Sequence, residues 1–221
     1  MSRFSIYRNP GKRYLLVMKN YVYLLAICFL LTSCTRRPVQ NDAPVNRVPM
    51  DHSTMDHSKM DSSPGAANAP YELQFIDTMI MHHGGAIDAA QLVATRAQHK
   101  ELIELAKAII TGQQREVADM NRWRSEWFGN SPKAINMDLP GMRDGMKDMD
   151  GSKLDALKEN AFDLEFVRQM IPHHEGAVAM AKDILTRDVH PEIKNLAEDI
   201  IRSQTDEIEK MKAWQVEWER K

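Results

Sequence analysis

Two copies of a methionine–histidine pattern are the part of this sequence most suited to chemistry. Each copy reads Met-Ile-x-His-His, and the residues are Met79, His82 and His83, then Met170, His173 and His174. On a helix, positions i, i+3 and i+4 share one face, so a thioether and two imidazoles would point the same way. Neighbouring residues diverge by about 100° around the axis, so the two histidines of a pair need not bind one ion. The pattern predicts metal ligation inside a helical protein.

A second pattern, Gln-x-x-Glu-x-x-x-Met, follows each copy of the first. Offsets of three and seven again place these side chains along one helical stripe. If the stripe faces the interior, its polar groups need hydrogen-bond partners or a metal. The expected ligands are Glu116, Met120, Glu207 and Met211, with weaker candidates at Gln113 and Gln204.

The ligand types favour copper over other metals. Helical di-iron proteins use Glu-x-x-His motifs, but here Met79 and Met170 stand three residues before the histidines. A site of thioether and imidazole ligands selects copper, and Cu(I) more than Cu(II). A zinc ion would have only histidine and glutamate as ligands here, which is a less natural match. Two other histidines, His99 and His190, lie at predicted helix starts, where a structural role is sufficient.

Composition and charge exclude several other classes of protein. The 221 residues include 15 Met and 8 His but only 2 Cys, and the formal net charge is −2. A near-neutral chain is not expected to bind nucleic acid, which selects for basic surfaces. The sequence contains no Walker phosphate loop, no Gly-x-Ser-x-Gly elbow and no His-Glu-x-x-His motif. An enzymatic role is therefore not the favoured interpretation.

The N-terminus is typical of an export signal. Residues 1–33 carry five basic residues, no acid, and an apolar run over residues 21–33 that is shorter than the roughly 20 residues of a membrane span. The run ends in Leu-Thr-Ser-Cys, which resembles a bacterial lipoprotein signal with Cys34 as the lipidated mature N-terminus. Translation from Met18 and an uncleaved membrane anchor remain alternatives. We expect a lipid anchor on the periplasmic face of the cell envelope, and Thr35 favours the outer membrane.

Residues 34–70 are predicted to form a flexible tether. The segment is rich in Pro, Asn, Ser, Asp and Ala, so it cannot bury enough apolar surface to offset its ordering entropy. It also contains a Met-Asp-His repeat, and histidine-rich tracts are a known metal-binding composition. The weaker metal candidates in this segment are Met50, His52, Met55 and His57.

The remaining chain, residues 71–221, contains an internal duplication. Residues 71–127 align without a gap on residues 162–218, and 23 of the 57 aligned pairs are identical. Within each copy, apolar residues recur at three- and four-residue steps, with a break near residues 95–100 or 186–191. The pattern predicts an all-α fold, a four-helix bundle of two tandem helical hairpins joined by a methionine-rich link over residues 128–161. The second helix is expected to reach Trp127.

With these motifs assembled, the chain resembles the family called domain of unknown function 305. The resemblance rests on the segments FIDTMIMHHGGA and FVRQMIPHHEGA, and on IITGQQREVADMNRW and IIRSQTDEIEKMKAW. It implies a ferritin-like four-helix fold, and exported members of the family are associated with copper binding and copper tolerance. The family pattern often continues with Met-Ala, which implies Met180 as a further ligand. Ala89 occupies the matching position of the first copy, so the two sites are expected to be unequal.

The function predicted from these features is that of an exported lipoprotein that binds copper for buffering, tolerance or delivery at the envelope. Its expected partners are copper ions, the membrane through the lipid anchor, and a protein that exchanges copper with it. Two other classes stay open: a ferritin-like metal-dependent oxidase, in which Glu116 and Glu207 could act as bases, and a metal-free envelope interaction module.

Overall fold

The computed structural model describes residues 61–220, and its long helices account for most of them. These helices are α1 (Tyr71–Arg96), α2 (Lys100–Trp123), α5 (Glu159–Ile184) and α6 (Pro191–Trp218). The described range holds no β-strand, so the prediction of an all-helical fold is confirmed. None of its helices is long and apolar enough to cross a membrane. Contacts divide the chain into two units, Met1–Val48 and Pro49–Lys221, and the first lies outside the described residues.

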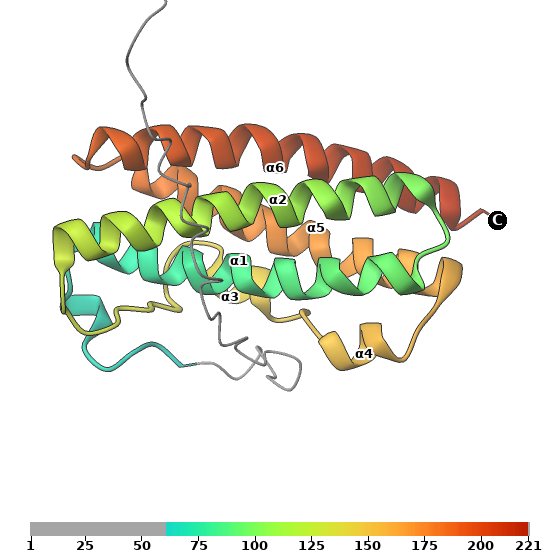
Figure 1. The fold of residues 1–221 in the computed structure, drawn as a ribbon, viewed down its shortest axis with the longest axis horizontal. Coiled ribbons are helices and arrows are strands. Elements are labelled where there is room, and N and C mark those ends of the chain that lie inside the picture. Colours follow the sequence, from blue (N-terminus) through green and yellow to red (C-terminus); the bar gives the residue numbers. More distant parts are fainter. Residues whose placement is uncertain (1–60, 221) are drawn as a thin grey trace, which may run out of the picture. The chain divides into compact units, whose positions relative to one another are not determined.

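The long helices form two hairpins, a first hairpin of α1 and α2 and a second hairpin of α5 and α6 (Figure 1). Residues 97–99 separate α1 from α2, close to the predicted break. In the second hairpin, α6 begins with Pro191, whose missing N–H is not needed in a first helical turn. The hairpins pack against each other through α1 and α5.

Because α2 and α5 run in the same direction, the chain between them must return along the length of the molecule (Figure 1). This return begins with a short π-helix, η3 (Arg124–Phe128), where the sequence predicted a continuous α-helix to Trp127. It continues through the short helices α3 (Met142–Met146) and α4 (Gly151–Asp155). Contacts of α3 with α5 and of α4 with α1 hold it against the two central helices.

The link touches α5 most closely at Gly141 and Gly176. Gly141 has a φ of 80°, in the left-handed region that favours glycine. A Cβ atom built on Gly176 would lie only 2.6 Å from the Gly141 carbonyl oxygen. Both positions therefore require glycine, one for its backbone conformation and the other for the close approach of two backbones.

The core consists largely of aliphatic, phenylalanine and methionine side chains from the four long helices and the link. Nine of the ten methionines in residues 61–220 are buried, and only Met81 is partly exposed. Residues 61–70, the last part of the predicted tether, contain a turn of 3-10 helix, η2 (Ala66–Asn68). Ser63 donates its backbone N–H to the Ile135 carbonyl oxygen at 2.7 Å, which fastens this segment to the link.

Candidate metal centre

The two hairpins meet at a pair of closely packed, tilted histidine rings. His82 of α1 and His173 of α5 are fully buried, and their ring centroids lie 3.7 Å apart at an interplanar angle of 32°. His173 Nε2 donates to the backbone carbonyl oxygen of His82 at 3.1 Å, which leaves Nδ1 of His173 without a hydrogen. That Nδ1 and both ring nitrogens of His82 have no hydrogen-bond partner.

The second histidine of each pair points to a glutamate on the other helix of its own hairpin. His83 Nε2 lies 2.7 Å from Glu116 Oε2, and His174 Nε2 lies 2.7 Å from Glu207 Oε2. A carboxylate only accepts, so each Nε2 donates the hydrogen bond, and in a neutral ring each Nδ1 then has a free lone pair. Both Nδ1 atoms are buried and have no partner.

Burial keeps the central imidazoles neutral. It lowers the pKa of His82 and of His173 well below 6.5, and the neighbouring histidines lower each pKa further because two imidazolium ions would repel. A neutral imidazole is the form that binds a metal. Each buried polar atom without a partner costs about 1–3 kcal/mol, so five such nitrogens in one core are a feature that stability alone does not explain.

The buried methionines belong to two separate hydrophobic clusters. We call the larger group the first methionine cluster, which contains Met79, Met120, Met137, Met142, Met146 and Met180. The second methionine cluster contains Met149, Met170 and Met211. The expected thioether ligands are thus divided between two apolar clusters. Ala89, which aligns with Met180, packs in the same cluster as Met149, Met170 and Met211.

The link contributes four methionines that were not among the sequence-predicted ligands. A Cβ atom built on Gly85 would lie 3.6 Å from Met146 Cε, 4.0 Å from Met149 Cε and 3.7 Å from His173 Nε2. Two link thioethers and a central imidazole therefore surround one small space beside α1. The signal was visible in the composition of residues 128–161, because Met137, Met142, Met146 and Met149 are concentrated there.

The glutamates and glutamines of the second pattern lie at the edge of the core. Gln113, Glu116, Gln204 and Glu207 all line a cavity of about 180 Å³ between α2 and α6. Each glutamate thus contacts a buried histidine and also faces the cavity. In residues 61–220, no three His, Cys, Asp or Glu side chains are grouped as a metal site.

The remaining predicted candidates lie outside the described residues. They are Met50, His52, Met55 and His57 of the tether, and Cys34 at the expected lipidation site. Their roles stay predictions.

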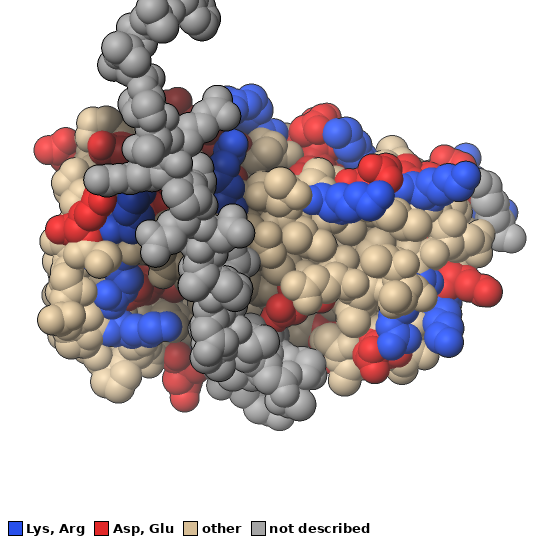
Figure 2. Space-filling view, viewed as in Figure 1, with Lys and Arg blue, Asp and Glu red and all other residues tan. Residues whose placement is uncertain are grey.

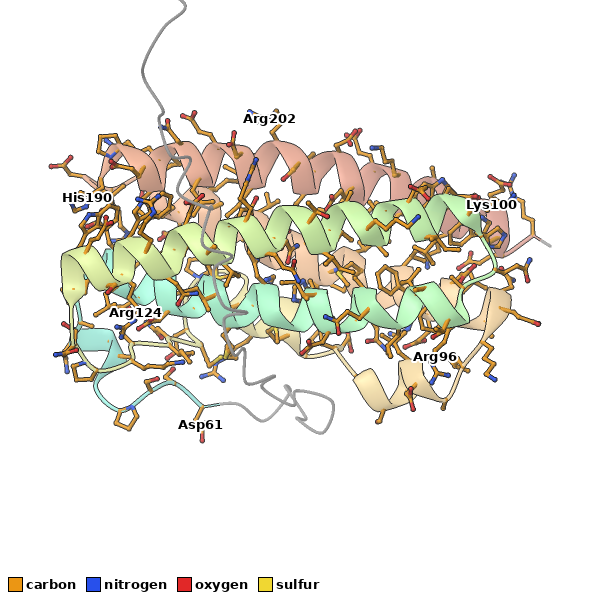
Figure 3. All side chains as sticks on the ribbon, in the orientation of Figure 1. Asp61, Arg96, Lys100, Arg124, His190 and Arg202 are labelled. Carbon is orange, nitrogen blue, oxygen red and sulfur yellow. The ribbon has the colours of Figure 1, made fainter. Side chains whose placement is uncertain are left out.

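His99 and His190 are held by acidic residues of the opposite hairpin, at opposite ends of the molecule. His99 Nδ1 lies 2.6 Å from Asp163 Oδ2, and its ring stacks on Trp218. In the equivalent arrangement, His190 Nδ1 lies 2.9 Å from Glu72 Oε1, and its ring stacks on Trp127. Figure 3 shows His190 at one end and Lys100, next to His99, at the other. These rings have partners and join the two hairpins.

Solved structures of similar proteins share this fold. A structure of CopM in the Cu(II)-bound form is 40% identical, has a TM-score of 0.59, and covers 66% of this chain and 97% of CopM. CopM in the Cu(I)-bound form is 41% identical with a TM-score of 0.56, covering 66% of this chain and 96% of CopM. A DUF305 fragment from Deinococcus radiodurans is 29% identical with a TM-score of 0.58, covering 67% and 97% of the two chains.

Sequence comparison agrees with the structural likeness. An uncharacterized protein, L153, of Acanthamoeba polyphaga mimivirus is 47% identical over 58 residues, which are 25% of this chain and 38% of that protein. The sequence model of the family described as Domain of unknown function (DUF305) matches residues 72–215. The resemblance seen in the helical motifs is therefore confirmed, and the chain belongs to the DUF305 family.

Proposed function

We propose that this protein binds copper, Cu(I) in preference to Cu(II), in its buried histidine–methionine core. The observation that carries this proposal is the set of five buried imidazole nitrogens without hydrogen-bond partners. Two of them belong to His83 and His174, whose rings are oriented by glutamates in the way that ligating histidines usually are. The bound forms of CopM, which include Cu(I) and Cu(II), support the proposal.

The ligand chemistry favours the monovalent ion. Methionine sulfur and neutral imidazole are soft or borderline ligands, and copper is the first-row metal that they select. Apart from Glu116 and Glu207, which each accept a hydrogen bond from a histidine, the buried side chains of the two methionine clusters are uncharged, and a monovalent ion is less costly to bury among them than a divalent one. We assign one ligand set to His83 with Met79 and Met120, and the other to His174 with Met170 and Met211. The link methionines Met146 and Met149 would complete these sets beside His82 and His173.

We also propose that the fold arose by duplication of one helical hairpin and that it is a ferritin-like bundle. The two hairpins are interpreted as copies of one unit, because equivalent residues 91 positions apart make equivalent contacts, as His83–Glu116 and His174–Glu207 do. Together they would form a ferritin-like four-helix bundle.

The proposed place of action is the cell envelope. A lipid on Cys34 would attach the protein to the periplasmic face, with the outer membrane favoured. The part of residues 34–70 that precedes the contact of Ser63 with the link would act as a tether. There the protein would buffer copper or deliver it to a partner protein. Labelling with radioactive palmitate in a bacterial host tests the anchor: the wild type should incorporate label and the Cys34→Ala variant should not.

The copper site is tested by titration of the full chain with Cu(I) against a competing chelator. The double variant His83→Ala with His174→Ala should lower the affinity at least tenfold, about 1.4 kcal/mol. His190→Ala is the matched control, because that ring is 45% exposed at the end of the molecule and should leave affinity unchanged. X-ray absorption of the wild-type complex should show sulfur and nitrogen ligands. Unchanged affinity in the double variant would refute the site.

A further inference from the structure

Near its N-terminal end, the link is fastened to α1 by hydrogen bonds. The buried carboxylate of Asp77 accepts one from Arg124 Nε, just ahead of the link, at 2.6 Å, and one from the backbone N–H of Ala134 at 2.9 Å. The backbone N–H of Asn136 donates to Thr78 Oγ1 at 2.9 Å. These bonds are buried or partly buried, so this end of the link is held firmly.

The C-terminal end of the link is fastened in the same way. Gln169 of α5, which is buried, accepts a hydrogen bond from the backbone N–H of Asp150 at 2.9 Å. Arg96 at the end of α1 pairs with Asp155 of α4, and charged side chains of both signs lie over α4 at the lower right of Figure 2. The two arginines labelled in Figure 3, Arg124 and Arg96, thus lie near the two fastened ends.

The middle of the link is held differently. We call residues 138–149, which include α3, the flap. Within the described part of the chain, the flap forms hydrogen bonds with the link itself and none with a long helix. It is held by four buried apolar side chains, those of Leu139, Met142, Met146 and Met149. Lifting the flap therefore breaks no hydrogen bond to the helices, whereas lifting either end of the link does.

The flap covers the central histidines. A Cβ atom built on Gly145 would lie 3.3 Å from His82 Nε2 and 3.3 Å from the carbonyl oxygen of His173. Both histidines are fully buried, and His82 Nε2 has no hydrogen-bond partner. An ion can reach this nitrogen only after a covering group moves away. The flap is a short covering segment that is not hydrogen-bonded to the helices beneath it.

We propose that the flap opens as a unit and is the gate through which copper reaches His82 and His173. Segments with few apolar contacts and no hydrogen bonds to the core open locally while the rest of a protein stays folded. The hinges would lie next to the fastened ends, as in other lids that close over a site. Opening would also bring Met142 and Met146 to the solvent, where their thioethers could take up Cu(I). The role as a gate rests on the proposed copper function, whereas the opening of the flap does not.

Hydrogen exchange of the metal-free full chain, with a chelator present, tests the opening. The amides of α3 should exchange about tenfold faster or more than those of α5 beneath them, because flap opening exposes them without global unfolding. Leu139→Ala should accelerate the exchange of α3 about fivefold or more, because it removes one of the apolar contacts that close the flap. This substitution removes no thioether.

The matched control for this variant is Leu196→Ala on α6. Leu139 and Leu196 are 5% and 7% exposed and pack in the same apolar cluster, but only Leu139 belongs to the flap. The control should destabilise the whole fold and change the exchange of α3 less than about twofold. Leu139→Val removes less of the contact and should act in the same direction with a smaller change, so it replaces the alanine variant if that variant does not fold.

Stopped-flow release of Cu(I) from the full chain to an excess of chelator tests the gate. The wild-type rate should level off as the chelator concentration rises, because flap opening then limits release. Leu139→Ala should raise this limiting rate about fivefold or more, and Leu196→Ala should change it less than twofold. A wild-type release rate in Leu139→Ala, or an equal increase in Leu196→Ala, would overturn the gate.

The two measurements separate this proposal from the copper function. If the amides of α3 exchange ahead of those of α5 but the chain binds no Cu(I), the copper function is refuted and the opening of the flap is not. If the chain binds Cu(I) while α3 and α5 exchange together, the flap is refuted and the copper function is not.

Discussion

The two hairpins carry the same histidines and glutamates, but their methionine surroundings differ. The first methionine cluster has six members and the second has three. The difference comes mainly from the link, which sends Met137, Met142 and Met146 to the first cluster and only Met149 to the second. The residues that the two hairpins have in common explain what the halves share, and the link, which has no counterpart in the described residues, explains how they differ.

The link packs closely against only one of two equivalent glycines. Gly85 and Gly176 occupy matching positions, yet only Gly176 is in backbone contact with the link, through Gly141. The expectation of unequal copper sites came from Ala89 standing where the other copy has Met180. The link increases this inequality, because it adds thioethers on the side that already contains Met180.

The largest expected effect is a loss of folding stability in acid, and it comes from His82 and His173, which occupy equivalent positions in the two hairpins. His82 and His173 have pKa values well below 6.5 in the folded chain, so the unfolded state takes up protons first as pH falls. Stability is then complete above pH 6.5 and decreases below it, by up to about 4 kcal/mol between pH 7 and pH 5 for both residues together.

Urea denaturation of the metal-free chain at several pH values, with a chelator present, measures this loss. Replacing both residues, His82→Leu with His173→Leu, should remove most of the loss between pH 7 and pH 5. If the variant loses as much stability as the wild type over that interval, the His82–His173 pair is not the source of the acid sensitivity.

The next largest effect is expected from alanine at the two equivalent glycines, because the two substitutions should change the free energy of unfolding by different amounts. A Cβ atom on Gly176 would lie 2.6 Å from the Gly141 oxygen and 3.1 Å from Gly145 Cα, and neither backbone atom can rotate away. We expect Gly176→Ala to lower the free energy of unfolding by about 2–3 kcal/mol.

The matched change, Gly85→Ala, meets only the ends of Met146 and Met149 and the His173 ring, at 3.6 Å or more. Because alanine favours a helix over glycine by about 1 kcal/mol, this variant should be as stable as the wild type or more so. Urea denaturation compares the two, and equal losses would contradict the asymmetric placement of the link.

The helices could be predicted from the sequence because their apolar spacing is local information. The breaks after Arg96 and before Pro191 agreed with the structure for the same reason. The turn at Arg124–Phe128 could not be predicted as a π-helix, since a single wider turn of five residues is too short to have a recognisable apolar periodicity of its own.

The candidate site could be predicted only in part. Duplication identified the histidines, but the free Nδ1 of His83 depends on Glu116, which lies 33 residues away in sequence and on another helix. The link methionines were visible in composition, yet their placement depends on the contact between Gly141 and Gly176. The type of each side chain can be read from the sequence. Whether its polar atoms lack hydrogen-bond partners depends on how the helices pack, which the sequence does not show.

The contact of His99 with Asp163 is more buried than the equivalent contact of His190 with Glu72. Breaking the two should therefore lower stability by different amounts, both smaller than the effect of Gly176→Ala. Asp163 is fully buried and accepts hydrogen bonds from His99 Nδ1 and from the backbone N–H groups of Gln98 and His99. Its replacement, Asp163→Asn, should cost about 2 kcal/mol, because hydrogen bonds to a charged group are lost. The equivalent change, Glu72→Gln, should cost about 0.5 kcal/mol, since solvent screens the half-exposed His190. Thermal melting should rank the two in this order, and the reverse ranking would contradict it.

The smallest effect should come from removing one thioether from each methionine cluster. Met180→Leu and Met211→Leu keep a similar volume, so each should alter stability by less than about 1.5 kcal/mol. Their effects on Cu(I) affinity should differ, because five thioethers remain in the first cluster after the change and only two in the second. A loss of about tenfold, or 1.4 kcal/mol, is expected for Met211→Leu and less than about twofold for Met180→Leu. Competition titration with Cu(I) measures both, and equal losses would mean that the additional methionines of the first cluster do not act as reserve ligands.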